Sequence, residues 1–343
     1  MMLADPPLSR ASSLPQWGGV NLKSPATKLL RYRPVPTRPA AMLLPALDWH
    51  PQPRLEPLHL DWLARAGVEV AVLRLDRIDP LISGNKWFKL VHHLRAAHEA
   101  GAEGIMSLGG AYSNHLHALA AAGKRFGFPT AGLLRGHPQD TPTVRDLKAF
   151  GMDLHWLGYG GYRERHAADF WGPWQLRYPH LHPVPEGGSG LPGAQGCMTW
   201  VASVGEQLAA LGWVDYHGWW LACGTGTSLA GLVLAEAGAR PVYGVLAVPP
   251  DHGVARQVER IVGETGLSSP RHELFDGSRG GFARVDAELT AFIETTTAIE
   301  LEPLYTGKAL MVLKARVEAG GFAPGTRLVF VHTGGLQGRR GFD

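Results

Sequence analysis

The sequence has few of the features that mark disulfide-rich, membrane or nucleic-acid-binding proteins. Its two cysteines, Cys197 and Cys223, among 343 residues provide neither a disulfide framework nor a cysteine cluster for a metal. It has no run of about 18 consecutive apolar residues, so we expect no membrane-spanning helix. The formal net charge is only +3, which gives no strong indication of a nucleic-acid partner. These absences favour a soluble, cytoplasmic, globular protein.

Histidine is abundant, but its spacing does not suggest a metal site. His115 and His117 are two residues apart on a predicted helix and would face different directions, while His92 and His93 are adjacent. Two ligands on one helix face need a separation of three or four residues. We therefore expect no bound metal.

The first 41 residues differ in composition from the rest of the chain. They are rich in Pro, Ser and Arg, and Asp5 is their only acidic residue. They lack the continuous apolar region of a secretory signal, and their prolines argue against the long amphipathic helix of a transit peptide. We expect residues 1–41 to be a disordered extension, with the folded protein starting at Met42.

From residue 55 onward, apolar strand-like segments alternate with helix-like segments. Strands are predicted at 68–76, 104–108, 130–136, 218–224, 241–248 and 327–332, and helices at 87–101, 115–127, 143–151, 199–212 and 228–238. This alternation predicts an α/β protein with parallel sheets covered by helices on both faces. Ligands in such folds bind at the carboxyl ends of the strands, which selects the loops 83–86, 109–115, 223–228 and 333–335.

The glycine-rich turn of CGTGTSLAGL (223–232) suits a phosphate group. Gly224 and Gly226 allow a sharp turn with exposed amides, Thr225 and Thr227 add hydroxyl donors, and a helix amino terminus follows. The turn lacks the lysine of a P-loop and the third glycine of a dinucleotide-binding fingerprint. The alternative is a tight strand-to-helix turn that binds nothing.

The other selected loops carry groups that complement a phosphate site. Lys86 follows a Ser-Gly-Asn turn at the start of a helix, although an ordinary exposed lysine would also fit there. Ser113 or Asn114 can cap the helix that follows, or can bind an anion. Tyr305 precedes another predicted helix, a position where tyrosine more often serves packing, and Thr333 ends a strand.

Together these groups describe a site for a small phosphorylated aldehyde. Pyridoxal 5'-phosphate (PLP) fits, because it needs a lysine for a Schiff base and a loop for its phosphate. An NAD-type nucleotide-binding protein is the alternative from another class. It would need an acidic ribose ligand about 20 residues after the glycines, where the sequence has Pro249 and Pro250. A catalytically silent protein that binds amino acids or a partner is a third interpretation.

Five segments in this order resemble the 1-aminocyclopropane-1-carboxylate deaminase and D-cysteine desulfhydrase family of PLP enzymes. They are ISGNKWFKL (82–90), GGAYSNHLHALAAA (109–122), CGTGTSLAGL (223–232), LEPLYTGKA (301–309) and LVFVHTGG (328–335). The resemblance covers residues 55–343. It implies the tryptophan synthase β-like fold (fold type II): two open, twisted, mostly parallel sheets flanked by helices. It also implies a small domain at 90–190, a large PLP-binding domain at 42–89 and 191–343, and a homodimer.

The resemblance also implies a role for individual residues. Lys86 would form the Schiff base, Asn114 would contact the phenolic oxygen of the cofactor, and Tyr305 would be catalytic. Ser113 and His115, beside Asn114, would hold the substrate carboxylate or assist proton transfer. The remaining cofactor-binding residues would be Lys89, Gly224, Thr225, Gly226, Thr227, Thr306 and Thr333.

Two departures from the family pattern bear on the substrate. Trp87 and Phe88 replace a small and a basic residue after the lysine, and we expect them to reshape the wall of the pocket. Thr306 follows Tyr305 where deaminases that open the cyclopropane ring carry Glu, so the sequence resembles the desulfhydrase branch more closely. We expect β-elimination from a D-cysteine-like amino acid to pyruvate, ammonia and sulfide. Ring opening of aminocyclopropane carboxylate and PLP-dependent β-replacement are the alternatives. We also expect a hydroxyl from Thr333 or Thr306 near the ring nitrogen.

Overall fold

The computed structural model describes residues 48–267, 270–281 and 283–341. These residues belong to one compact unit. The predicted extension at 1–41 lies outside the described residues and stays a prediction.

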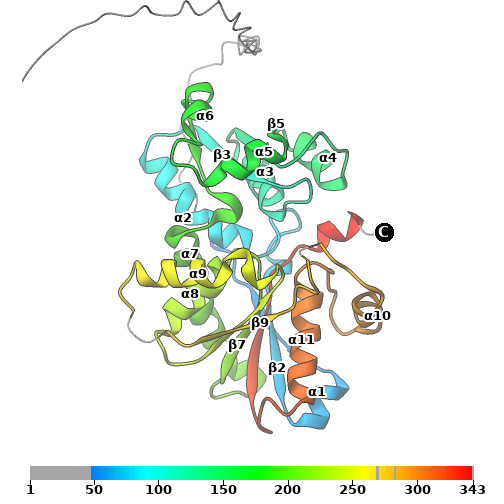
Figure 1. Ribbon diagram of the computed structural model, residues 1–343. Helices are drawn as coiled ribbons and strands as arrows, with labels where there is room; N and C mark the ends of the chain where they lie inside the picture. Colours follow the sequence, from blue (N-terminus) through cyan, green and yellow to red (C-terminus); the bar gives the residue numbers. More distant parts are fainter. Residues whose placement is uncertain (1–47, 268–269, 282, 342–343) are drawn as a thin grey trace, which may run out of the picture. The chain divides into compact units, whose positions relative to one another are not determined.

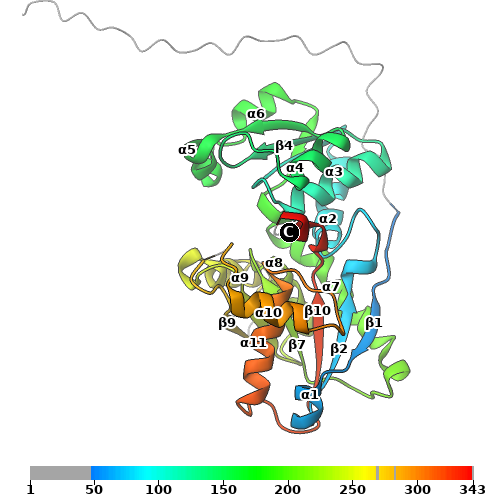
Figure 2. The same cartoon turned by 90° about the vertical axis from the view of Figure 1, so that its right-hand side faces the viewer.

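The larger of two sheets has six strands, and all neighbouring strands are parallel except β1 and β2. In spatial order they are β1 (Arg54–Leu58), β2 (Glu69–Arg74), β10 (Arg327–His332), β7 (Gly218–Cys223), β8 (Val242–Leu246) and β9 (His272–Asp276). Helices α7 (Leu191–Gly205), α8 (Thr227–Glu236) and α9 (Val254–Gly263) cover one face. The other face carries α1 (Asp61–Ala66), α10 (Ala287–Thr295) and α11 (Thr306–Glu318) (Figures 1 and 2).

The smaller sheet has four parallel strands, in the order β5 (Asp153–Trp156), β4 (Thr130–Leu134), β3 (Gly104–Gly109) and β6 (Leu181–Pro183). Helices α2 (Lys86–Glu99), α3 (Asn114–Phe126) and α4 (Pro142–Ala149) share a hydrophobic core with one of its faces. The short helices α5 (Gly158–Arg163) and α6 (Gly172–Arg177) lie in the segment that packs on the other face. The predicted fold class is thus confirmed. The smaller sheet falls within the predicted small domain, but the domain boundaries stay a prediction.

Helix α2 belongs to the cores of both sheets because its first aromatic side chains point in different directions. The ring of Trp87 packs 4.6 Å from that of Trp49, in the core beside the smaller sheet. The ring of Phe88 meets Trp200 edge-on at 5.5 Å, in a core of the larger sheet. Both rings are buried in hydrophobic cores, and the expectation that they shape the pocket wall stays a prediction.

Helix α7 differs from its sequence prediction at both ends. It begins at Leu191, eight residues before the predicted start at 199, and ends at Gly205. Its first half is rich in glycine, which disfavours helix locally but allows close contact with neighbouring helices. A Cβ atom at Gly196 would collide with the carbonyl oxygen of Phe88. Tertiary packing therefore overrides local propensity in this segment.

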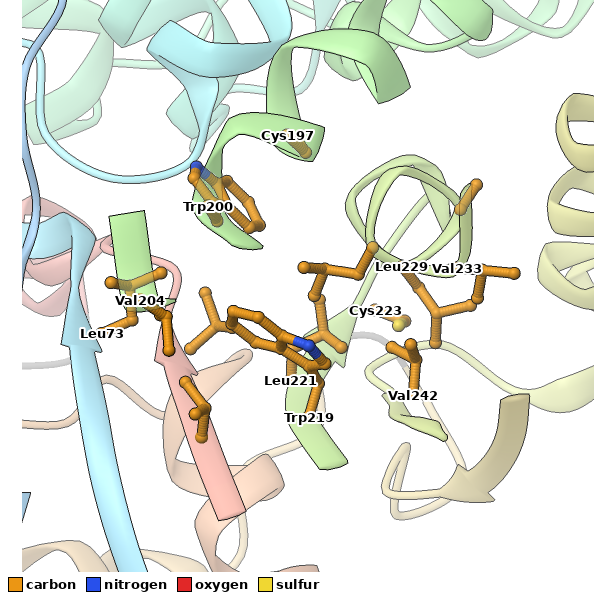
Figure 3. Close-up of a cluster of buried hydrophobic side chains, with 14 of the residues drawn as sticks. Leu73, Cys197, Trp200, Val204, Trp219, Leu221, Cys223, Leu229, Val233 and Val242 are labelled. Carbon is orange, nitrogen blue, oxygen red and sulfur yellow. The ribbon is translucent and has the colours of Figure 1, made fainter. Parts of the chain in front are cut away.

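A hydrophobic core supports the glycine-rich turn from below. Figure 3 shows Trp219, Leu221 and Cys223 of β7 between Trp200 of α7 and Leu229 of α8. All six residues of β7 are buried, as expected for a parallel strand covered on both faces. The turn that follows β7 is therefore attached to a fully buried strand.

Candidate functional site

The turn before Lys86 brings three of the four predicted loops together. Gly84 has φ of +83°, and a Cβ atom there would collide with the carbonyl oxygen of Thr333. The backbone amide of Asn85 donates to that same oxygen at 3.1 Å. The side-chain amide of Asn85 donates to the hydroxyl of Ser228 at 3.0 Å. The loops 83–86, 223–228 and 333–335 therefore meet at one place.

A buried polar network, which the sequence analysis did not identify, supports these loops. Arg74 donates from Nε and Nη2 to the carboxylate of Asp76 at 2.9 and 2.6 Å. The hydroxyl of Ser83 donates to the carbonyl of Asp76 at 3.0 Å. The amide of Gly334 donates to Nδ1 of His332 at 3.3 Å. These contacts hold Ser83 and Gly334, which neighbour the two residues of the Asn85–Thr333 hydrogen bond.

Lys86 is the first residue of α2, and its side chain is only partly exposed. Burial lowers the pKa of its amine well below the ordinary 10.5, and the nearby charge of Lys89 lowers it further. Lys89 is 3% exposed, and its Nζ donates to the hydroxyl of Thr225 at 3.3 Å. Lys89 thus lies at the glycine-rich turn, and its charge acts on the amine of Lys86.

The glycine-rich turn leaves the amino terminus of α8 without a side-chain cap. Gly226 occupies the N-cap position with φ of +76°, and no side chain of its own can accept from the first amides. The hydroxyls of Thr225 and Thr227 lie 3.0 Å apart at this turn. A Cβ atom at Gly224 would lie 3.1 Å from Cε1 of Tyr305, so glycine lets that ring approach. Uncapped amides and paired hydroxyls are the groups that bind a phosphate.

A second glycine-rich loop, which the sequence analysis missed, adjoins these residues. Gly187 and Gly188 both have positive φ, 68° and 64°. A Cβ atom at Gly187 would lie 3.1 Å from Cγ2 of Thr225, and one at Gly188 would lie 3.1 Å from Cβ of Lys89. The two adjacent glycines at 187–188 could have revealed this loop from the sequence, because such glycines mark a backbone that approaches its neighbours closely.

The loop before α3 places Ser113, Asn114 and His115 in different environments. Ser113 is the N-cap and accepts from the amide of Leu116 at 3.2 Å, which confirms the capping interpretation for this residue. The Oδ1 atom of Asn114 accepts from the side chain of Gln337 at 3.0 Å. The prediction that Ser113 also contacts substrate stays a prediction.

His115 is 2% exposed, and its ring is oriented by Ser107. The hydroxyl of Ser107 donates to the carbonyl of Val184 at 2.7 Å, so it accepts from Nε2 of His115 at 2.8 Å. Nδ1 then carries a lone pair, and it has no hydrogen-bond partner among the described residues. Burial, and then the charge of Lys86, hold the pKa of His115 well below its ordinary value. His115 is a neutral acceptor inside the site.

The start of α11 is held by a buried carboxylate that the sequence analysis also missed. Glu302 accepts from the amides of Leu304, Tyr305 and Thr306 at 2.8, 2.9 and 2.6 Å. The hydroxyl of Thr306 also donates to it, at 3.0 Å. Burial raises the pKa of the Tyr305 phenol, so that hydroxyl stays protonated at neutral pH. Glu302 lies only a few residues before the predicted helix, and an acceptor side chain at that position indicates a helix cap in the sequence.

No helix in the described ranges is long and apolar enough to cross a bilayer. Nor does any group of three or more His, Cys, Asp or Glu residues in the described part of the chain have the arrangement of a metal site.

These residues fit PLP on the chemistry of the donor set. A buried lysine with a lowered pKa can form an imine, and an uncapped helix terminus beside two threonines can bind a phosphate. The family model described as pyridoxal-phosphate dependent enzyme matches residues 53–334. The chain therefore belongs to this family of PLP-dependent enzymes, and PLP is its cofactor. This membership replaces the NAD-type alternative.

Individual relatives agree with the predicted resemblance. A Pyrococcus horikoshii protein, provisionally named a 1-aminocyclopropane-1-carboxylate deaminase, is 28% identical over 79% of this chain and 86% of its own. A D-cysteine desulfhydrase from Salmonella choleraesuis is 26% identical over 82% and 94%. The crystal structure of an ACC (1-aminocyclopropane-1-carboxylate) deaminase homologue superposes on this chain with a TM-score of 0.75 at 24% identity. The superposition covers 87% of this chain and 92% of the other. That structural likeness shows the fold, which is fold type II.

Proposed function

We propose that the protein catalyses β-elimination from a small amino acid, with a D-cysteine-like substrate giving pyruvate, ammonia and sulfide. The reaction consumes one water molecule and involves no net oxidation. The observation that carries the proposed reaction is that the loop before Lys86, the uncapped, glycine-rich turn at 224–227 and Tyr305 meet at one place, with the pKa of Lys86 lowered there. When bound, PLP accepts the electron pair left on the α-carbon of an amino acid.

Lys86 has the properties of the base in this reaction. Because its pKa is lowered by burial and by Lys89, the amine is more often neutral near pH 7 than an exposed lysine would be. A neutral amine can take a proton from the α-carbon of the substrate. The predicted Schiff-base role uses the same nitrogen and the same neutral form.

Tyr305 and His115 complement Lys86 with opposite hydrogen-bonding capacities. Tyr305 retains its proton because of its raised pKa, so it can donate to a sulfur that leaves the β-carbon. His115 presents an unpartnered lone pair at Nδ1 and can accept a hydrogen bond from the substrate amine. These roles for Tyr305 and His115 are part of the proposal.

The proposed substrate rests on Thr306, which follows Tyr305 at the position where deaminases that open the cyclopropane ring carry Glu. Thr306 is fully buried, and its hydroxyl proton is used by Glu302. That leaves Thr333 as the better candidate for the hydroxyl near the ring nitrogen.

The name of the Salmonella relative supports a D-cysteine-like substrate, whereas the name of the Pyrococcus relative supports cyclopropane opening as the second candidate. The predicted homodimer and cytoplasmic location also stay proposals.

A panel of amino acids tests the reaction and the substrate together. The purified protein, loaded with PLP, is incubated with D- and L-cysteine, D- and L-serine and 1-aminocyclopropane-1-carboxylate. Keto-acid, ammonia and sulfide are then measured. We expect equal amounts of the three products from D-cysteine. Release of 2-oxobutyrate from the cyclopropane at a comparable rate would replace the proposed substrate with the second candidate.

Borohydride reduction tests the role of Lys86 independently of the substrate. Reduction should fix PLP to the peptide that contains Lys86, as detected by mass spectrometry. The variant Lys86→Ala should lose both this adduct and the near-ultraviolet absorbance of the bound cofactor. Lys124→Ala, which changes an exposed lysine on α3, is the matched control. A wild-type level of adduct in Lys86→Ala would contradict the proposed function.

A further inference from the structure

The segment after β10 leaves the larger sheet and lies against the helices of the smaller one. Leu336–Gly341 forms a short 3-10 helix beside α4, and Figures 1 and 2 show this end of the chain, in red, beyond β10. Arg340 pairs with Asp146 of α4, and Asp146 also contacts Nε2 of His117 at 3.1 Å. A Cβ atom at Gly341 would lie 2.6 Å from the ring of Tyr112. Contacts therefore anchor this segment on α3, α4 and the loop between β3 and α3.

Before these anchors the segment passes directly beside the side chain of Asn114. Nε2 of Gln337 donates to Oδ1 of Asn114 at 3.0 Å. A Cβ atom at Gly335 would lie 2.9 Å from Nδ2 of Asn114, and one at Gly338 would lie 3.7 Å from Oδ1. Gly335 has φ of +91°, a conformation that favours glycine. The segment thus defines the surroundings of both polar atoms of this one amide.

We infer that Gln337 is a positioning residue that sets the direction of the Asn114 amide toward the cofactor. This inference rests on the proposed function, in which Asn114 contacts the phenolic oxygen of PLP. An amide has one acceptor side and one donor side. Because Gln337 occupies the acceptor Oδ1, the NH2 group remains available to donate. The glycine at 335 leaves that group uncrowded.

The direction of the amide decides whether the contact attracts or repels. A phenolic oxygen that carries negative charge needs a hydrogen-bond donor, and an NH2 group supplies one. If the amide turned by 180°, it would present its oxygen to the negatively charged oxygen of the cofactor. Gln337 therefore acts through Asn114 and does not itself need to touch the cofactor.

Two substitutions of Gln337 separate this role from simple packing. Gln337→Glu keeps the size but offers only acceptors, so it should turn the Asn114 amide around. Gln337→Leu removes the contact without reversing it. We expect the dissociation constant for PLP to rise about tenfold in Gln337→Glu and about threefold in Gln337→Leu, the range for one hydrogen bond. If Gln337 served packing alone, Gln337→Leu would raise the dissociation constant for PLP at least as much as Gln337→Glu.

The measurement is a titration of cofactor-depleted protein with PLP, followed by absorbance. Gln175→Glu, an exposed position on α6, is the control for added charge and should bind PLP like the wild type. Urea unfolding of each cofactor-depleted variant checks that the fold is retained. In an Asn114→Ala background, Gln337→Glu should change the dissociation constant less than about twofold, because coupled residues are not additive.

The outcomes distinguish this inference from the proposed function. If the wild type takes up no PLP, or if borohydride does not fix PLP at Lys86, both are wrong. If the wild type binds normally but Gln337→Glu and Gln337→Leu match it, only the role of Gln337 is wrong. The role of Gln337 would also be wrong if Gln337→Glu raised the dissociation constant for PLP as much in the Asn114→Ala background as in the wild type. Gln337 would then act independently of Asn114.

Discussion

At the scale of single residues, function and stability impose opposite demands on Lys86. Its side chain begins a helix in a desolvated environment, with a second buried lysine three residues later. Burial makes the ammonium form costly, and this cost produces the neutral amine that the proposed chemistry uses. The residue should therefore destabilise the protein in the absence of cofactor.

Replacing Lys86 by methionine should stabilise the cofactor-free protein at neutral pH, by roughly 1 kcal/mol. The pKa of Lys86 is lower in the folded than in the unfolded chain, so below the folded pKa the wild type bears the whole cost of burying the ammonium. The cost falls as pH rises through the folded pKa and is gone above about 10.5, the pKa of the unfolded state. The advantage of Lys86→Met, measured by urea unfolding, should therefore shrink between pH 7 and pH 10. An advantage that stays constant with pH would show that it comes from packing instead.

At the scale of elements, the start of α11 depends on one buried carboxylate. Glu302 accepts hydrogen bonds from three consecutive backbone amides and from the hydroxyl of Thr306. The helix begins in the position that holds the ring of Tyr305 against Gly224. A change in the cap should therefore affect both the stability of the helix and the position of the tyrosine.

Glu302→Ala should lower the free energy of unfolding by roughly 2 kcal/mol, because it removes the cap and leaves buried amides without acceptors. Glu318→Ala at the other end of α11 is the matched control, since it breaks only the exposed pair with Lys314 and should cost less than about 1 kcal/mol. Both are measured by urea unfolding of cofactor-depleted protein. Equal losses in the two variants would show that the carboxylate does not serve as a cap.

At the scale of the whole molecule, the two sheets are joined by contacts from distant parts of the chain. Helix α2 contributes Trp87 to one core and Phe88 to another. Trp49, near the start of the described residues, packs on Trp87, and the guanidinium of Arg125 lies 4.3 Å from the ring of Trp49. The folded unit therefore needs a segment that precedes its first strand.

Truncation should define where the folded protein begins. A chain that starts at Met42 should unfold at the same urea concentration as the full chain and bind PLP equally well. A chain that starts at Pro51 loses Trp49 and should be less stable by roughly 2 kcal/mol, the scale of a lost aromatic contact and its buried area. Trp49→Ala in the full chain is the control and should reproduce that loss. A large loss already at Met42 would mean that residues 1–41 contribute to the fold.

Local chemistry made part of this structure predictable from the sequence. The strand at 327–332 and the helices after 86 and 114 were recognisable because their apolar periodicity agrees with their burial. Helix α7 began eight residues earlier than predicted, because its glycines serve contacts with residues far away in the chain. The sequence analysis did not foresee that Trp87 and Phe88 enter different cores, because a sequence does not reveal which core a side chain enters.

The loops proposed to carry the site could be recognised from the sequence alone, because glycine turns, capping residues and strand ends are local properties. Folding alone sets which distant groups face one another: Lys89 at Thr225, Asn85 at Ser228, and Gln337 at Asn114. The last pair joins residues 223 positions apart in the chain. Such pairings depend on how the two sheets are placed against each other, which no short stretch of sequence encodes.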